Sequence, residues 1–291
     1  MKQTLLIHSL LACFNFVQAQ DLKLFEIGYA YYPESKIKEA TAGQEIIYRE
    51  LQATLKVPVV FNDKKTILIN ALSYGLVHPK ATNTQLSSAE GRLHYIGYSL
   101  TAIQRLGEKW RLVATITPAI SSNLKGSLSK DDFLLLSNLM VGKQVSQAFS
   151  WSAGLAYTTR FGEPIIIPIA DFRYKKNNFK LNATVPYKIE ALLSNKQNNL
   201  EYGLRFSIRG SQFNLDTTAS NPIDVIRFSR MNFGPKFTYR VKDPISLFLF
   251  SGMSINRRHQ LISDSIGDID FGTENGFFIN AGLFISPRQM K

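Results

Sequence analysis

The amino-acid sequence predicts an all-β protein, an antiparallel transmembrane β-barrel of about 14 strands, with roughly 12 to 16 possible. Two observations predict this fold. Segments with alternating apolar and polar residues recur along the whole chain, and the connections between them alternate between short turns and longer loops. The composition agrees: 45% of the 291 residues are hydrophobic and 12% aromatic, while 19% are charged. These numbers and the single cysteine exclude a disordered chain and a disulfide framework.

The clearest strand is predicted at 110–121, where Trp110 and Ile116 alternate with Arg111 and Thr117. A period of two places one apolar and one mostly polar face on a strand. The same alternation marks 51–59, 95–102, 149–158, 200–209, 232–241 and 277–286. Counting from a first strand at 22–32 gives about 14 strands, and omitting the hairpin around Pro186 and Tyr187 gives about 12.

The connections fall into two classes. Short polar turns are predicted at 62–65, 107–109, 145–148, 175–178, 195–199 and 242–244. Longer links are predicted at 33–43, 78–91, 122–130, 161–164, 214–224 and 260–275. Tight periplasmic turns that alternate with longer external loops are typical of outer-membrane barrels, and an even strand number places both ends of the barrel on the periplasmic side.

A soluble β-sandwich or lipocalin-like barrel also shows alternation, but its strands are usually shorter. The predicted strands match the roughly 9 to 11 residues that cross a bilayer. Aromatic residues also gather near the strand ends, where a membrane barrel carries its interfacial girdles. They are Tyr74, Trp110, Phe149, Tyr157, Tyr174, Phe179, Tyr202 and Tyr239.

Four prolines lie inside strand-like segments: Pro58, Pro118, Pro168 and Pro235. Each removes a backbone donor from the sheet. We therefore expect bulges or strand ends at these positions.

Residues 1–19 are predicted to be a signal peptide, with an apolar run from Leu5 to Val17 and a small-residue cleavage site that ends at Ala19. Residues 20–291 then form the barrel. In an alternative interpretation, Leu10 to Cys13 form a lipoprotein box and Cys13 is acylated. The predicted location is the outer membrane of a Gram-negative bacterium after cleavage of the signal.

The chain resembles an uncharacterised Bacteroidetes-type outer-membrane β-barrel family, one of the groups known as domains of unknown function. The resemblance rests on the end of the signal peptide at 18–20, the opening 25–29, the hairpin spacing and the closing strand 276–285. It implies a fold and a location but no reaction. Such barrels usually end on an aromatic residue that the barrel-insertion machinery recognises, whereas here six residues follow Ile285. Either Phe284 serves that role or insertion has another cue.

No catalytic constellation is identifiable. His78, His94 and His259 are far apart in sequence and do not form a metal-binding spacing. A lipid hydrolase would need one of them beside a serine, and a chance pairing of His94 or His259 with a serine is unremarkable. We therefore predict no catalytic residue, no metal and no cofactor, and treat an enzyme as a distant alternative.

The longest acidic cluster lies at 264–274 and contains Asp264, Asp268, Asp270 and Glu274. Its spacing does not match that of a calcium-binding loop. We interpret it as a solvated external loop that contacts lipopolysaccharide through divalent cations.

The polar face of the strands carries more basic than acidic residues, in a chain with 34 Lys and Arg against 22 Asp and Glu. The basic residues predicted to face the lumen are Lys56, Arg111, Lys180, Arg205, Arg209, Arg230, Lys236 and Arg240, against Glu50 and Glu201. Fixed positive charge in a lumen raises the local concentration of anions. This predicts a pore or uptake channel for small, anionic solutes.

Two alternatives stay open. The arginines can pair with carboxylates of inward-folded loops and plug the lumen, which gives a structural or surface-interaction barrel without transport. The second, more distant alternative is a membrane-embedded lipid hydrolase. The expected partners are membrane lipid, lipopolysaccharide, small solutes and the barrel-insertion machinery. Nucleic acid is not expected, because the basic residues are dispersed over the strands.

Overall fold

The computed structural model describes residues 22–38, 44–61, 65–82, 91–216 and 222–287. The predicted signal peptide, with Cys13, lies outside these residues. The strands are β1 (Phe25–Lys36), β2 (Glu45–Val60), β3 (Thr66–Thr82), β4 (Leu93–Leu106), β5 (Trp110–Ser122), β6 (Phe133–Gln144), β7 (Phe149–Thr158), β8 (Ile165–Lys176), β9 (Phe179–Val185), β10 (Lys188–Ser194), β11 (Leu200–Asn214), β12 (Val225–Lys242), β13 (Ile245–Ile262), β14 (Ile269–Thr273) and β15 (Gly276–Ile285). A 3-10 turn, η2 (Lys130–Asp132), precedes β6. No helix in the described ranges is long and apolar enough to cross a membrane.

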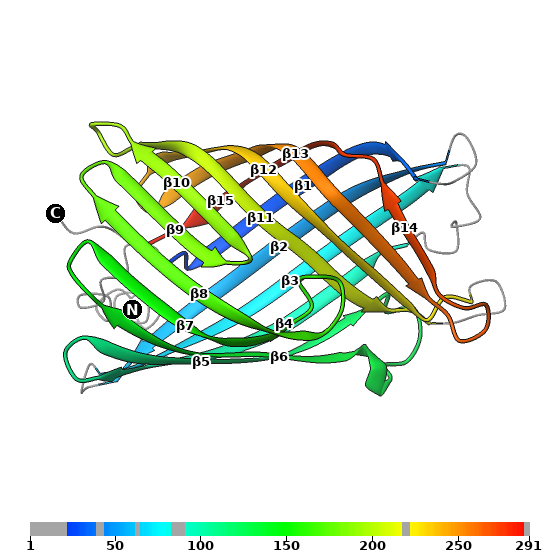
Figure 1. Ribbon diagram of the computed structural model, residues 1–291, viewed down its shortest axis with the longest axis horizontal. Helices are drawn as coiled ribbons and strands as arrows, with labels where there is room; N and C mark the ends of the chain where they lie inside the picture. The colour runs from blue at the N-terminus through cyan, green and yellow to red at the C-terminus, as the bar shows by residue number, and fades with distance from the viewer. Residues whose placement is uncertain (1–21, 39–43, 62–64, 83–90, 217–221, 288–291) are drawn as a thin grey trace, which may run out of the picture.

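The strands form one closed antiparallel barrel (Figure 1). Strands β1 to β13 each pair with the next strand in the chain, and β15 pairs with both β13 and β1. Strands β14 and β15 lie end to end along β13, because β14 pairs with residues 257–261 and β15 with residues 245–254. They share one position in the ring, so the barrel has 14 strand positions. The predicted fold class is confirmed.

The two ends of the barrel differ, as the connections predict. At the turn end, short turns join the strand pairs, and β1 begins opposite the end of β15, with Phe25 facing Ile285. At the loop end, β1, β3 and β13 continue beyond the predicted strand ends, to Lys36, Thr82 and Ile262. The loop-end connections are therefore shorter than predicted there.

The hairpin around Pro186 and Tyr187 is present but short. Strands β9 and β10 have 7 residues each, whereas the following strand, β11, has 15. The Ile208 amide donates to the Tyr187 carbonyl over 2.8 Å, just where the hairpin ends. Beyond this point β11 has no partner on the β10 side and crosses toward the opposite wall, where Asn214 pairs with Ser122 of β5.

This crossing joins opposite walls at the loop end. The Ser121 hydroxyl donates to the Gln212 carbonyl, and the Asn123 amide donates to the Asn214 carbonyl over 3.1 Å. The Asn214 side chain donates to Asp132 of η2 over 3.0 Å. The barrel is thus pinched between β5 and β11.

The hydrogen bonds around Asp132 affect the pKa of its carboxyl group. Burial alone raises the pKa of this carboxyl, but hydrogen bonds from Ser122, Ser129 and Asn214 outweigh it and lower the pKa below its ordinary value. The side chain is only 3% exposed. Asp132 therefore holds the connection between β5 and β6 in its charged form.

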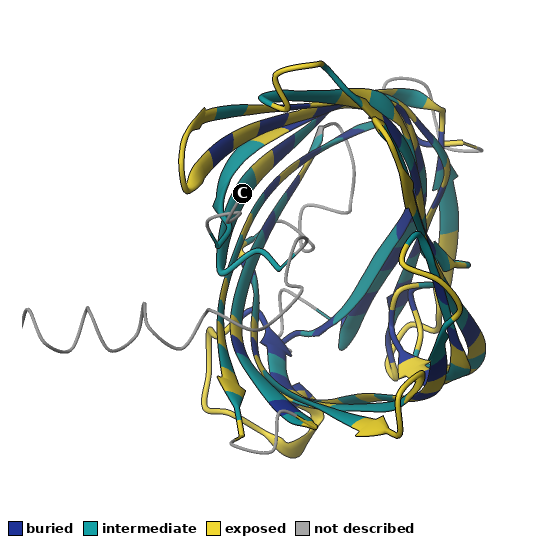
Figure 2. Ribbon diagram, turned by 90° about the vertical axis from the view of Figure 1, so that its left-hand side faces the viewer, coloured by how far each residue is buried: buried dark blue, intermediate teal, exposed yellow. Residues whose placement is uncertain are grey.

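The outer surface is a belt of exposed apolar side chains, and burial alternates along the strands when the barrel is viewed from the turn end (Figure 2). Leu72 is 55% exposed, Leu155 57% and Ile166 70%. Soluble monomers rarely expose a continuous apolar surface of this extent. The predicted girdle residue Trp110 lies at its edge, where it begins β5 and stacks edge-on against Trp151 with 6.0 Å between ring centroids. Tyr74, also predicted for the girdle, lies in the middle of β3.

The expectation that bulges or strand ends accommodate the four prolines is wrong. All four lie inside strands whose register continues past them. Pro118 stays opposite Leu135 on one side, while pairing to the other neighbour, β4, skips two positions. Pro235 likewise stays paired with Leu204 of β11, while the pairing of β12 with β13 is interrupted at this position. The missing donor faces only one neighbour, so only one ladder is interrupted.

Each of the other two prolines has a paired strand on one side only, because the strand on the other side does not extend that far. Pro58 lies beyond the point where β1 begins, since the last β1 pairing on β2 is Leu55 with Phe25. Pro168 lies beyond the end of β9, whose pairing with β8 stops at Ala170 and Val185. At both positions the neighbouring strand ends rather than the strand that carries the proline.

Candidate functional site

The interior of the barrel is the candidate site, and its two halves differ. In the half near the loop end, buried side chains from eight strands and from the connection between β11 and β12 pack into one cluster, which we call the lumen core. Its members are Ala30, Tyr32, Ile46, Tyr48, Val77, Leu93, Phe213, Leu215, Ile223, Ile226, Phe228, Phe250, Leu261 and Phe278. Tyr32, Phe213, Phe250 and Phe278 are each no more than 1% exposed.

Aromatic rings from different strands contact one another inside the lumen core. The rings of Tyr48 on β2 and Phe228 on β12 lie 5.5 Å apart, although three strand positions separate these strands around the ring. Phe250 packs edge-on against Phe278 at 4.8 Å, and Phe278 stacks on Tyr32 at 5.8 Å. Inward-facing side chains of an open pore would contact water, whereas these contact each other.

A buried ion pair crosses the interior beside the lumen core. Arg230 on β12 donates to Glu50 on β2, and the two side chains are 3% and 11% exposed. Arg209 reaches the second oxygen of Glu50 at 3.8 Å. The Arg230 guanidinium also lies 3.9 Å from the centre of the Tyr32 ring. One carboxylate thus neutralises one of two neighbouring guanidiniums.

A second cluster surrounds Glu190 on β10, which is 4% exposed. Its carboxylate accepts a hydrogen bond from Lys236 Nζ over 2.8 Å. Arg205 lies at 3.4 Å and Lys188 at 3.7 Å. Three cations therefore share one carboxylate. Glu190 was not among the residues predicted to face the lumen, although the alternation of Lys188 and Glu190 with Ile189 is the signal that could have identified it.

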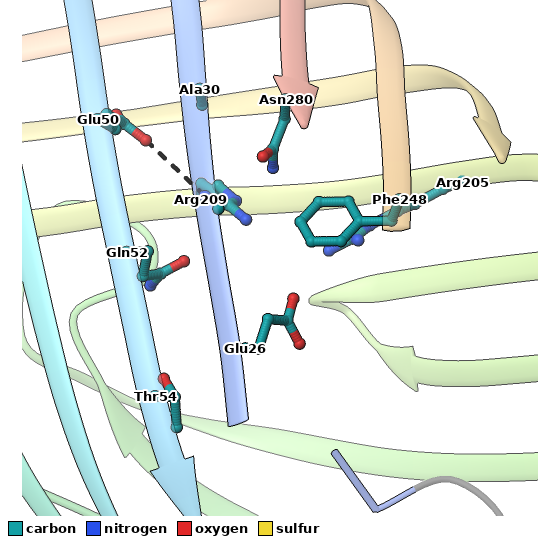
Figure 3. Close-up of a pocket in the computed structure, with 10 residues that line it drawn as sticks. Glu26, Ala30, Glu50, Gln52, Thr54, Arg205, Arg209, Phe248 and Asn280 are labelled. Carbon is teal, nitrogen blue, oxygen red and sulfur yellow. Dashed lines mark ion pairs between the residues drawn. The ribbon is translucent and has the colours of Figure 1, made fainter. Parts of the chain in front are cut away.

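Toward the turn end, the interior opens into a polar pocket, which we call the vestibule (Figure 3). Its cavity volume is about 50 Å³, and it is partly open to solvent. Its lining residues are Glu26, Gly28, Ala30, Glu50, Gln52, Thr54, Arg205, Arg209, Phe248 and Asn280. The ion pair of Glu50 with Arg209 forms the boundary between the vestibule and the lumen core.

A neutral wall of hydroxyl groups continues along β2 to β5. Thr54 bonds to Ser73 at 3.2 Å, and Thr101 bonds to Thr115 at 3.0 Å. Ser99 and Thr117 form a third pair at 2.8 Å. These groups carry no charge, whereas the cations of the Glu50 and Glu190 clusters lie on β10 to β12.

The eight basic residues predicted for the lumen are not equivalent. Arg205, Arg209, Arg230 and Lys236 meet in the two clusters just described. The other four lie elsewhere. Arg111 donates to Ser152 over 3.1 Å, and Arg240 lies 3.7 Å from Asp243 at the turn end. Lys56 and Lys180 lie on β2 and β9, opposite Ala71 and Leu192. The carboxylates of the two clusters, Glu50 and Glu190, come from strands β2 and β10, whereas Asp243 lies in a turn.

The histidines do not assemble a catalytic group in the described residues. His94 Nδ1 lies 3.0 Å from the Tyr74 hydroxyl. His259 is buried and stacks between Tyr48 and Phe271, with ring centroids 5.4 and 4.9 Å away. No serine hydroxyl bonds to either ring there. His78 lies opposite Arg49 on β2.

The predicted acidic loop is partly a strand. Asp270 belongs to β14, and the backbone amide of Asp264 donates to Asp224 over 2.8 Å. Among the described residues, no group of three or more metal-ligating side chains is placed to hold an ion. Contact of this loop with lipopolysaccharide stays a prediction.

The closed ring, the outward apolar belt and the charged interior define an outer-membrane-type β-barrel. The chain belongs to the family described as Domain of unknown function (DUF6268), whose model matches residues 15–286. The predicted membership in a family of unknown function is confirmed, while the Bacteroidetes-type origin stays a prediction. No characterised protein gives a significant sequence match.

Solved structures with a similar fold include several outer-membrane proteins. An outer membrane channel from Pseudomonas putida F1 is 14% identical, with a TM-score of 0.43, over 93% of this chain and 99% of that chain. Outer membrane phospholipase A from Escherichia coli is 8% identical, with a TM-score of 0.37, over 96% of both chains. The translocator domain of the autotransporter NalP from Neisseria meningitidis is 11% identical, with a TM-score of 0.37, over 98% and 95%.

Proposed function

We propose that the protein is a barrel of the Gram-negative outer membrane, inserted after removal of residues 1–19, whose lumen is closed to passive flux at the loop end. The apolar belt supports a lipid-facing surface, because its exposed side chains would otherwise contact water. The turn end then faces the periplasm and the loop end faces outward. The protein thus acts as a structural or surface-interaction barrel that presents its external loops.

The single observation behind the closed lumen is the lumen core. Burial of one Phe-sized side chain stabilises by about 1.5 to 3 kcal/mol. A water-filled passage would expose at least Tyr32, Phe213, Phe250 and Phe278, so its opening costs roughly 6 to 12 kcal/mol. At 1.4 kcal/mol for each factor of ten, the open form is populated at roughly one part in 10⁴ to 10⁸. Such a population carries no steady current.

A channel for small anionic solutes is the second candidate, and the vestibule favours it. The Glu50 and Glu190 clusters contain more cations than carboxylates. A purely structural interior has no need of this excess. In this case a partner or a transmembrane signal would have to open the lumen core before solutes pass.

Planar-bilayer recording of the purified, detergent-folded protein separates the two. We expect no steady conductance from the wild type and a measurable one from the double variant Phe250→Ala and Phe278→Ala, which removes two buried aromatic rings of the lumen core. Stable anion-selective current from the wild type would contradict the closed lumen. Loss of that selectivity in Arg205→Gln and Arg209→Gln would then favour the channel.

A further inference from the structure

We propose that a small monovalent anion, the size of chloride, is buried beside Arg257 in the half of the barrel near the loop end. The proposed ligands are the guanidinium groups of Arg257 and Arg230 and the hydroxyl groups of Ser254 and Thr273. The site lies apart from the vestibule. It does not depend on whether the lumen conducts.

The backbone is irregular where the site lies. On β13, pairing with β12 shifts register between Ile255 and Arg258, and Asn256 has a φ of 48°. On β1, the register shifts between Tyr32 and Ser35. The last strand is interrupted at the same level, since Thr273 ends β14 and Gly276 begins β15. Bulges re-aim side chains and are common at functional sites.

The β13 bulge places Arg257 inside the barrel. Ser254 and Arg257 are both buried, at 0% and 2% exposure, although they are three residues apart. Strict alternation from Ser254 would turn Arg257 outward to the apolar belt. The positive φ of Asn256 absorbs the extra residue, and asparagine adopts this conformation more readily than most residues.

The pairing of the neighbouring strands brings the other ligands to the same place. Thr273 is the register partner of Arg257, and Gly276 is the partner of Ser254. A Cβ atom at Gly276 would lie 3.0 Å from Arg257 Nη1, so glycine leaves room for the guanidinium. Nη1 donates to the Ser35 hydroxyl.

Donor atoms around this point lack partners within the described structure. The four that can donate are Arg257 Nη2, Arg230 Nε, Ser254 Oγ and Thr273 Oγ1, each with its residue no more than 3% exposed. One buried acceptor, Asn232 Oδ1 on the register partner of Ser254, also lacks a partner there. Guanidinium nitrogens only donate hydrogen bonds, and hydroxyl groups can donate as well. The set therefore suits an anion rather than a cation.

The charges point the same way. Glu50 neutralises Arg230, whereas no carboxylate in the described chain lies within ion-pair distance of Arg257. The two guanidiniums lie 3.9 and 5.9 Å from the same Tyr32 ring. A buried charge without a partner is strongly unfavourable. Water can satisfy the hydroxyl groups, but only an anion also neutralises the second arginine.

Bromide replaces chloride and scatters anomalously, so it is the probe. We expect an anomalous peak beside Arg257 in crystals of the full chain grown in bromide. We also expect the melting temperature to rise by about 3 to 6 °C in bromide at ten times its dissociation constant, relative to gluconate at equal ionic strength. Absence of both the peak and the shift would overturn the proposal in favour of buried water.

Variants tie the effect to the site. Arg257→Gln should abolish the difference between bromide and gluconate. The matched control Arg258→Gln changes the adjacent, exposed arginine and should retain it. If Arg257→Gln does not fold, Ser254→Ala should still raise the bromide concentration at half effect several-fold. An equal bromide response in all folded variants would overturn the proposal.

Discussion

Replacement of Glu50 by glutamine tests the ion pair that crosses the barrel interior. Glu50 contacts Arg230 through one carboxylate oxygen and lies 3.8 Å from Arg209 through the other. The change keeps the size of the side chain but leaves Arg230, 3% exposed, without its counter-charge. Removal of one partner of a buried pair costs about 3 to 5 kcal/mol. Because glutamine still accepts one hydrogen bond, we expect a loss near the lower end, about 3 kcal/mol.

Urea unfolding of the detergent-folded barrel, followed by tryptophan fluorescence, measures this loss. Glu163→Gln is the matched control, because Glu163 is 60% exposed and lies 4.0 Å from Arg227. An exposed pair of this kind contributes about 0 to 1 kcal/mol. The double variant Glu50→Gln and Arg230→Met should recover at least half of the loss, since it removes the unpaired charge as well. A loss below about 1 kcal/mol in Glu50→Gln, or no recovery in the double variant, would refute the reasoning.

Three further predictions follow from the interior and the loop end. Phe278→Ala should lower the free energy of unfolding by about 3 to 5 kcal/mol, and the adjacent Phe277→Ala, on the outer belt, by less than half as much; equal losses in urea titration would count against the lumen core. Glu190→Gln should cost at least as much as Glu50→Gln, because it leaves three cations without a carboxylate, and a smaller loss in the same assay would show that they relax into solvent. The pKa of Asp132 is lowered in the folded state, so its contribution to stability is present above the ordinary carboxyl pKa of 3.8 and is lost as the pH falls below that value. Proteolysis of the connection between β5 and β6 should therefore increase at low pH in the wild type and should not change with pH in Asp132→Asn.

Much of the fold could be predicted because the barrel obeys a period of two. Turns such as 107–109, 145–148 and 195–199 end and begin strands at the predicted residues. Alternation also placed Arg205, Arg209, Arg230 and Lys236 on the polar face, and these four meet in the interior. Both results depend only on local sequence, which is why they were within reach.

The features that sequence reasoning missed depend on breaks in that period or on contacts across the ring. Arg257 follows a bulge at Asn256, so simple alternation assigns it to the wrong face. Tyr48 and Phe228 meet although three strand positions separate β2 from β12 around the ring. The pinch between β5 and β11 comes from the short hairpin of β9 and β10, which frees the end of β11. No pattern within one strand encodes such a contact.

Access of water to the interior tests the closed lumen most directly. With Cys13 replaced by alanine, single cysteines are placed at Thr54, in the vestibule, and at Ser254, which is 0% exposed beside the lumen core. The folded variants are then treated with a membrane-impermeant maleimide. The closed lumen predicts that Thr54→Cys reacts readily and that Ser254→Cys reacts only after unfolding in urea. Similar reaction rates for the two folded variants would contradict it.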